Sequence, residues 1–376
     1  MVFVAGQAEK KRRLAQFDTI EKEIGMAGYH SLFPGGWGAA GGGKLTAPAG
    51  PAVLVIFAAA LGDLAVFAPG LQKVREKHED ANLVLLSRSE KGAGHLIPSL
   101  IRVDECVMDP CPRRPPEFLK FIRRLRDYNF TDIYHLHETD RTLFYCLFLP
   151  RRGQHRRSGR TILASLLTRS VAREPKGRLG RPHDRARRFW RGCGIEAGAR
   201  LDMSAIPALT PEVRAALPAG DFALVVPGSG LLSRRGESEW PPASTKRWPS
   251  RYFGEIARRL EGEGVRPVVI GVEGDRYALE DIRAVCPAAV DFLGKTTPFD
   301  MIHLGVRARV MVTNDTGPVH WASMGGVRSV SLFGSDVSPE VWAARGTIAL
   351  ERDPLALLEP GRVWSAVKQQ LEKSDD

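Results

Sequence analysis

Residues 314–326, NDTGPVHWASMGG, decide between two folds. Their Asp-Thr-Gly triplet is the one that carries the acid of aspartic proteases. Those enzymes need two such triplets in an all-β setting, because two aspartates share one proton. This chain has one triplet, placed between the apolar run RVMVTN (309–314) and an apolar segment opened by Gly-Pro. A strand, a tight turn and a helix fit this pattern, and a protease is excluded.

The same alternation of strands and helices extends in both directions from this stretch. Strands are predicted at 52–59, 81–87, 130–137, 222–228, 266–271, 309–314 and 327–334. Helices are predicted at 66–78, 116–129, 183–193, 250–264, 275–286, 297–308 and 318–326, with a closing helix through Val363, Val367 and Leu371. Two successive βα sets predict an α/β chain with two doubly wound domains, whose ligands bind at the carboxyl ends of the strands.

The domain boundaries follow from composition. Residues 1–50 end in a glycine-rich stretch and are predicted to be an appendage with a flexible linker. Residues 51–205 are predicted to form the first domain and residues 206–376 the second, because the prolines of residues 195–220 indicate a crossing. No apolar run approaches the ~20 residues of a membrane-spanning helix. No signal peptide is apparent, so a cytoplasmic protein is expected.

Charge and cysteine content narrow the class of partner. The net charge of +11 is concentrated in residues 151–191, where fourteen Arg or Lys face two acidic residues. This concentration favours a polyanionic partner. Only Phe189 and Trp190 stand among these arginines, so nucleic acid is disfavoured and an anionic glycolipid or membrane surface is preferred. The five cysteines are scattered without a Cys-x-x-Cys, which predicts reduced thiols and no zinc site.

The start of the helix after Asp315 is a candidate anion site. Pro is favoured at a first helical position, where its missing N–H costs nothing. The N–H groups of Thr316, Gly317 and Val319 are therefore expected to face an anion. His320 follows in the first turn, and its residue type fits a partly buried helix histidine as well as a ligand contact.

Other strand ends carry further candidates. The turn around Gly228 and Gly230 offers backbone N–H groups to a phosphate, but the polar insertion 231–245 follows where a dinucleotide-binding helix would begin, so a dehydrogenase is disfavoured. Lys246 precedes a helix N-terminus, where its charge suits a diphosphate. An acid in GVEGD (271–275) suits ribose hydroxyls, although Asp275 is more typical of a helix cap.

Asp63 follows the first buried strand and has two interpretations. An isolated aspartate there is most often a helix N-cap. The carboxyl edge of a strand is also where a general base for an incoming hydroxyl would lie.

Taken together these residues resemble the heptosyltransferases of glycosyltransferase family 9, which act in lipopolysaccharide core assembly. The resemblance is carried by LGDLAVFAPGLQKVREKHEDANLVLL, PGSG, KRWPSRYFGEIARRL, GVEGD and DFLGKTTPFDMIHLGVRARVMVTNDTGPVHWASMGGVRSVSLFG, which span nearly all of residues 51–335. The run from LGKT through NDTGPVH to SLFG is the specific part. The appendage and the insertion 231–245 depart from the family pattern.

The resemblance implies a GT-B fold, in which two Rossmann-like domains face a deep cleft, and an inverting, metal-independent transfer without a cofactor. It implies that Asp63 is the catalytic base and that Lys246 meets the donor phosphates. Glu273 is then the ribose ligand. The other implied donor-side residues are Gly228, Ser229, Gly230, Asp315, Thr316, Gly317 and His320. The implied acceptor-side residues are Gly62, Arg141, His183 and Arg185.

The expected reaction moves a heptose or a related sugar from a nucleotide-diphospho-sugar to a hydroxyl of an anionic lipid-linked glycan such as lipopolysaccharide core. ADP-heptose is the expected donor. The protein is expected to work at the cytoplasmic face of the inner membrane as a peripheral protein. A non-catalytic nucleotide- or glycan-binding protein on the same scaffold is the alternative, and a nucleic-acid-binding protein that uses residues 151–191 is a third hypothesis.

Overall fold

The computed structural model describes most of the chain from residue 50 onward. The described residues are 50–57, 61–87, 93–109, 115–136, 142, 145–146, 148–149, 154–157, 181–198, 201–229, 246–334 and 338–373. The predicted appendage, Arg141, Gly230 and the insertion 231–245 lie outside these ranges. Residues Ala47–Asp376 form one compact unit.

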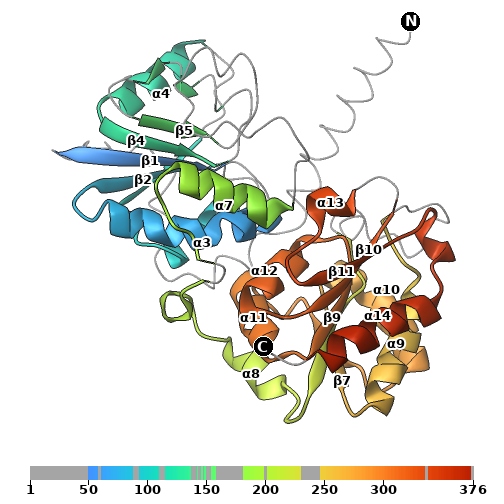
Figure 1. Cartoon of the computed structure of the whole chain (residues 1–376). Coiled ribbons are helices and arrows are strands. Elements are labelled where there is room, and N and C mark those ends of the chain that lie inside the picture. The colour runs from blue at the N-terminus through green and yellow to red at the C-terminus, as the bar shows by residue number, and fades with distance from the viewer. Residues whose placement is uncertain are drawn as a thin grey trace, which may run out of the picture. The chain divides into compact units, whose positions relative to one another are not determined.

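The first sheet has five parallel strands in the order β3-β2-β1-β4-β5 (Figure 1). They are β1 (Pro51–Phe57), β2 (Asn82–Ser87), β3 (Glu105–Met108), β4 (Asn129–His135) and β5 (Gln154–Arg157). All of β1 after Pro51 is buried, as expected for a central strand with helices on both faces of its sheet. The helices here are α3 (Leu61–Lys77), η2 (Ala93–Ser99), α4 (Pro115–Arg126) and α7 (Pro182–Gly192).

The second sheet has six parallel strands in the order β11-β10-β9-β6-β7-β8. They are β6 (Phe222–Val226), β7 (Arg266–Gly271), β8 (Val290–Leu293), β9 (Val310–Asn314), β10 (Ser329–Phe333) and β11 (Thr347–Glu351). Numbered from β6, this is the 3-2-1-4-5-6 order of a dinucleotide-binding sheet, in which β6 and β9 flank the point where the strand order reverses.

Helices cover both faces of the second sheet (Figure 1). They are α9 (Ser250–Gly262), α10 (Arg276–Val285), α11 (Pro298–Arg307), α12 (Gly317–Gly325) and α14 (Pro360–Glu372), with η4 (Glu273–Asp275) and η5 (Leu355–Leu357) beside them. Alternate strand residues such as Ala223 and Val225 share one core with α9, α10 and α14. Helices α11 and α12 pack together. Short helices η3 (Met203–Ala205), α8 (Pro211–Ala216) and α13 (Pro339–Trp342) lie in the connections.

Helix α3 begins earlier than the sequence pattern predicts. A start at Val66 was expected, but Gly62 and Asp63 already lie in the first turn. The interpretation of Asp63 as an N-cap is therefore wrong. A carboxylate in a first turn is favoured by the helix dipole in any case. No helix among the described residues is long and apolar enough to cross a membrane.

Candidate active site

The N-termini of α3 and α12 meet at two glycines. A Cβ added to Gly62 would lie 3.5 Å from the Cα of Gly317 and 3.6 Å from the Cδ2 of His320. The indole Nε1 of Trp321 donates a 2.9 Å hydrogen bond to the Leu61 carbonyl and fastens the contact. These helices follow β1 and β9, one at the centre of each sheet. Two positive helix ends thus lie side by side, an arrangement that an anion would stabilise.

The loop that enters α12 carries the Asp-Thr-Gly triplet. Asp315 is half-buried, and burial raises the pKa of its carboxyl, while the nearby Lys246 ammonium acts in the opposite direction. Lys246 is therefore close enough to Asp315 to favour its ionised form. Thr316 is the N-cap residue of α12, but its side chain makes no capping hydrogen bond. The expectation for Val319 is wrong, because its N–H donates to the Thr316 carbonyl at 3.3 Å.

A buried amide fixes the loop that holds Lys246. Asn314 is fully buried at the end of β9. Its Oδ1 accepts a 3.0 Å hydrogen bond from the Trp248 N–H, and its Nδ2 donates to the Pro227 carbonyl at 2.7 Å. Because Trp248 is two residues from Lys246, this one amide joins the Lys246 loop, the end of β6 and the Asp315 loop. The sequence places Asn314 in the motif but gives no sign of this role.

Arg247 was also missed by the sequence analysis. Its Nε donates a 3.1 Å hydrogen bond to the Ser229 Oγ, and its Nη1 donates to the Tyr277 hydroxyl. Arg247 is itself buried. Ser229, expected on the donor side, is therefore held by a cation rather than simply offered to a ligand.

Gly228 is required because an acid packs against it. A Cβ at Gly228 would come within 2.4 Å of the Asp275 Oδ2, and one at Gly271 within 2.6 Å. That carboxylate oxygen accepts a 3.0 Å hydrogen bond from the Val272 N–H. Asp275 precedes α10 but makes no side-chain cap to it, so the expected capping role is wrong and the carboxylate instead closes the turn at the end of β7.

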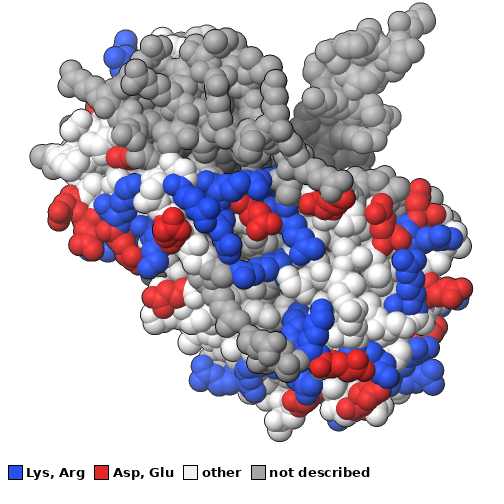
Figure 2. Space-filling model, in the orientation of Figure 1, with Lys and Arg blue, Asp and Glu red and all other residues white. Residues whose placement is uncertain are grey.

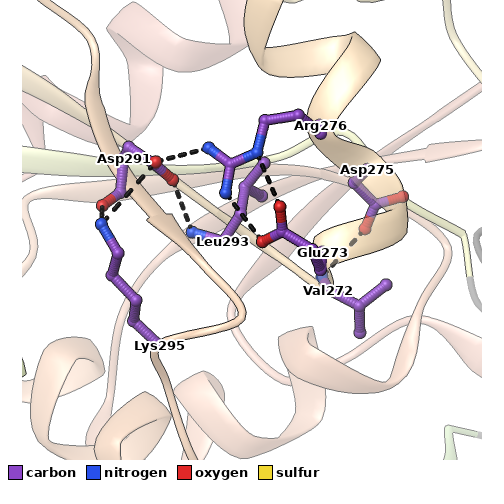
Figure 3. A network of polar contacts seen from close by, with 7 residues as sticks. All are labelled: Val272, Glu273, Asp275, Arg276, Asp291, Leu293 and Lys295. Atoms are coloured by element: carbon purple, nitrogen blue, oxygen red, sulfur yellow. Dashed lines mark hydrogen bonds and ion pairs between the residues drawn. The ribbon is translucent and has the colours of Figure 1, made fainter. Parts of the chain in front are cut away.

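Glu273 belongs to a network of charges at the end of β7 and β8 (Figure 3). Arg276 grips both carboxylate oxygens of Glu273, with Nε to Oε1 at 3.0 Å and Nη2 to Oε2 at 2.7 Å. Its Nη1 also donates to the Asp291 Oδ2 at 2.5 Å, while Lys295 Nζ donates to the Asp291 carbonyl. Hydrogen bonding to Arg276 lowers the pKa of Glu273. The Glu273 carboxylate is exposed, oriented and ionised.

Two histidines connect α12 with α7. The Nδ1 of His320 and the Nε2 of His183 lie 3.5 Å apart. Burial lowers the pKa of His320 to about 3, and burial with nearby Arg345 and Arg187 lowers that of His183 to about 4. Both imidazoles are therefore neutral at pH 7, when each can donate one hydrogen bond and accept another.

Arg185 lies against α13. Its guanidinium lies 5.4 Å from the ring centre of Trp342 on α13, and its Nη2 approaches the Val341 carbonyl at 3.5 Å. The structure brings Gly62, Gly317, His320 and His183 to one place, and Asp63 follows Gly62 in the first turn of α3. Lys246 influences the ionisation of Asp315. Glu273 lies with Arg276 in its own network. Among the described residues no group of His, Cys, Asp and Glu could hold a metal ion.

A solved structure shares the fold of this chain. The solved structure of E. coli ADP-heptose lps heptosyltransferase II is 18% identical and covers 85% of this chain and 98% of its own, with a TM-score of 0.60. The protein thus has the GT-B fold of two Rossmann-like domains, the architecture of a large class of glycosyltransferases.

The sequence comparisons show which family part of the chain resembles. Residues 237–349 match the model of glycosyltransferase family 9 (heptosyltransferase). Lipooligosaccharide heptosyltransferase 2 of Haemophilus influenzae is 29% identical over 102 residues, 26% of this chain and 29% of the relative. Lipopolysaccharide heptosyltransferase 2 of Salmonella typhimurium is 28% identical over 139 residues, 34% of this chain and 39% of the relative. The matched segments thus span well under half of these relatives, and they confirm the resemblance to glycosyltransferase family 9.

Proposed function

We propose that this protein is an inverting, metal-independent heptosyltransferase that moves the sugar of ADP-heptose to a hydroxyl of an anionic, lipid-linked glycan. One observation carries the proposal. The N-termini of α3 and α12 meet at Gly62 and Gly317, so that the candidate base Asp63, the next residue of α3, adjoins the loop that faces the donor.

The proposed transfer is a single displacement at the anomeric carbon. The acceptor oxygen attacks the anomeric carbon as Asp63 takes its proton, and the bond from that carbon to the diphosphate oxygen breaks on the opposite face. The diphosphate leaves with the electron pair. The Lys246 ammonium and the N–H groups that begin α12 stabilise its charge, a role that a divalent cation has in other transferases. Configuration at the anomeric carbon is therefore inverted.

The donor nucleotide is tested by thermal unfolding with ADP, UDP, GDP and TDP. We expect ADP alone to raise the melting temperature, since a ligand at a hundredfold excess over its Kd adds roughly 2.7 kcal/mol to the free energy of unfolding. An equal response to all four nucleotides would contradict the choice of ADP. Transfer itself is measured as ADP release from ADP-heptose with a heptose-free lipopolysaccharide core as acceptor. A selective ADP response without any ADP release would favour the non-catalytic binding protein.

Arg276 is expected to act as a positioning residue for Glu273. If Glu273 accepts the ribose hydroxyls, removing the bidentate grip in Arg276→Met frees the carboxylate and weakens ADP binding by roughly two- to tenfold, the entropy cost of ordering one side chain. Calorimetric titration with ADP and 2′-deoxy-ADP is the measurement. We expect Arg276→Met and Glu273→Gln each to reduce the preference for ADP over 2′-deoxy-ADP.

The double variant of Arg276 and Glu273 should lose little more than Glu273→Gln alone, because both changes act on one contact. Arg307→Met, at the exposed end of α11, is the matched control. An undiminished preference for ADP in Arg276→Met would remove the positioning role.

We also propose that the protein works at the cytoplasmic face of the inner membrane, as a peripheral protein. Helix α7 and the residue before it carry five arginines and one aspartate over residues 181–192, and Figure 2 shows basic side chains gathered over the position of α7. This surface suits an anionic glycolipid. Most of the basic segment 151–191 lies outside the described residues.

A further inference from the structure

A pocket between α3, α7 and the loop before β11 is not used by the reaction described above. The pocket is open to solvent. Val66, Pro69 and Gly70 of α3 form one wall, and His183, Arg187 and Trp190 of α7 form another, while Arg345 closes it from the second sheet's side.

The wall between α3 and α7 is firmly built. A Cβ at Gly70 would fall 2.2 Å from the Cδ1 of Trp190, so the helices are in close contact there. The Trp190 Nε1 donates a 3.2 Å hydrogen bond to the Phe67 carbonyl. The indole is therefore fixed, and its ring provides a rigid surface beside the charged groups.

The pocket is cationic. Arg187, Arg345 and His183 all line it. Among the described residues no ion pair joins either guanidinium to a carboxylate. Two guanidiniums that converge on one pocket beside a neutral imidazole are suited to a phosphate or carboxylate, which Arg binds with charge-assisted hydrogen bonds.

The pocket adjoins the candidate base along α3. Asp63, Val66 and Gly70 are spaced i, i+3 and i+7, so they share one face of the helix. At 1.5 Å per residue, the pocket wall lies roughly 5–10 Å along the axis from Asp63. That is comparable to the separation of a sugar hydroxyl from an anionic group on the same or the next sugar. At its other end the pocket reaches His183, which contacts His320 of α12.

We propose that this pocket binds a phosphate or carboxylate group of the sugar acceptor, and that Arg187 and Arg345 hold it while the reactive hydroxyl lies at Asp63. The inference rests on the proposed transferase function and adds the acceptor's anionic subsite to it. The donor diphosphate is assigned to Lys246 and the start of α12, so the pocket is left to the acceptor. The anion contacts residues beside both sheets, so its binding also links them.

The test uses inorganic phosphate as the probe and calorimetric titration in the presence of saturating ADP, which occupies the donor site. Arg187→Gln and Arg345→Gln are each expected to weaken phosphate binding about five- to tenfold, and the double variant to abolish measurable binding, because each removes one charge-assisted contact. Arg258→Gln, on an exposed turn of α9, is the matched control and should bind phosphate as the unaltered protein does.

Two results of the phosphate titration would overturn the proposal. One is phosphate binding that saturating ADP abolishes, because the donor diphosphate site would then account for it. The other is a double variant that binds phosphate with unchanged affinity. In transfer assays the single variants should raise the KM for heptose-free lipopolysaccharide core at least fivefold, with kcat and the KM for ADP-heptose within about twofold. If the unaltered protein binds phosphate beside ADP but never transfers heptose, the transferase function fails and the pocket stands. If the enzyme is active and the single variants leave the KM for the acceptor unchanged, the transferase function stands and the anion pocket fails.

Discussion

Asp63→Asn is expected to lower the turnover of heptose transfer by roughly a thousandfold, within the range that general-base catalysis contributes. The amide matches the carboxylate in size but cannot take the proton of the acceptor hydroxyl. Asp63 is half-buried in the first turn of α3, where asparagine is tolerated, so the fold should be retained. The measurement is ADP release from ADP-heptose at saturating acceptor, alongside the melting temperature.

The same variant should bind ADP with unchanged affinity, because the donor phosphates are assigned to Lys246 and the start of α12. Asp80→Asn, an exposed aspartate in the turn after α3, is the control for removing one negative charge from the same region. Near-normal turnover in Asp63→Asn would show that Asp63 is not the general base. Loss of ADP binding together with turnover would instead mean that the variant has disturbed the contact at Gly62.

The strands that were predicted from the sequence lie inside the sheets, and the strands that were missed lie at the edges. The central strands were predicted from long apolar runs, and the structure places β1, β2, β4, β6, β7, β9 and β10 at those runs. The strands β3, β5, β8 and β11 were missed, and each stands at an edge of its sheet. An edge strand has one strand neighbour, so it does not need the continuous apolar run that makes a central strand recognisable.

The candidate site also has one part that the sequence predicts and one part that it does not. The backbone positions were predictable, because parallel strands end at one edge and glycines mark the turns there. The side-chain partners were not. Asn314 reaches Trp248 and Pro227 across 66 and 87 residues of sequence, and nothing in the local pattern of either segment indicates such a contact. Arg276, by contrast, is three residues from Glu273, a spacing on which an acid–base pair can be anticipated.

Two cations near the ends of β6 and β7 have polar partners within the protein. Arg247 is tied to Ser229, and Arg276 is tied to Glu273 and Asp291. Each cation therefore has its own polar partner before any nucleotide arrives. Lys246 differs in its neighbour, Asp315, a half-buried acid whose charge it favours. A diphosphate would bring Lys246 a second anionic partner, and this makes Lys246 the cation to test.

Lys246→Gln is expected to lower the turnover of transfer by roughly a hundred- to a thousandfold, the typical cost of removing one group that stabilises charge in a transition state. In this variant only the N–H groups at the start of α12 stabilise the negative charge that develops on the leaving diphosphate. ADP binding should weaken as well, since part of the same interaction exists before reaction. Steady-state kinetics with ADP-heptose and titration with ADP measure the two effects separately.

The titration of Asp315 tests whether Lys246 acts from a position near this carboxyl group. Burial raises the pKa of Asp315, and the Lys246 ammonium opposes this, because a nearby cation favours the ionised carboxylate. Removing the ammonium should therefore move the Asp315 titration, followed by carbon NMR of its carboxyl group, to still higher pH. Lys368→Gln, an exposed lysine of α14, should leave both the titration and the turnover unchanged. A shifted Asp315 titration together with full turnover would mean that Lys246 lies near Asp315 but takes no part in the reaction. The N–H groups at the start of α12 would then stabilise the leaving group alone.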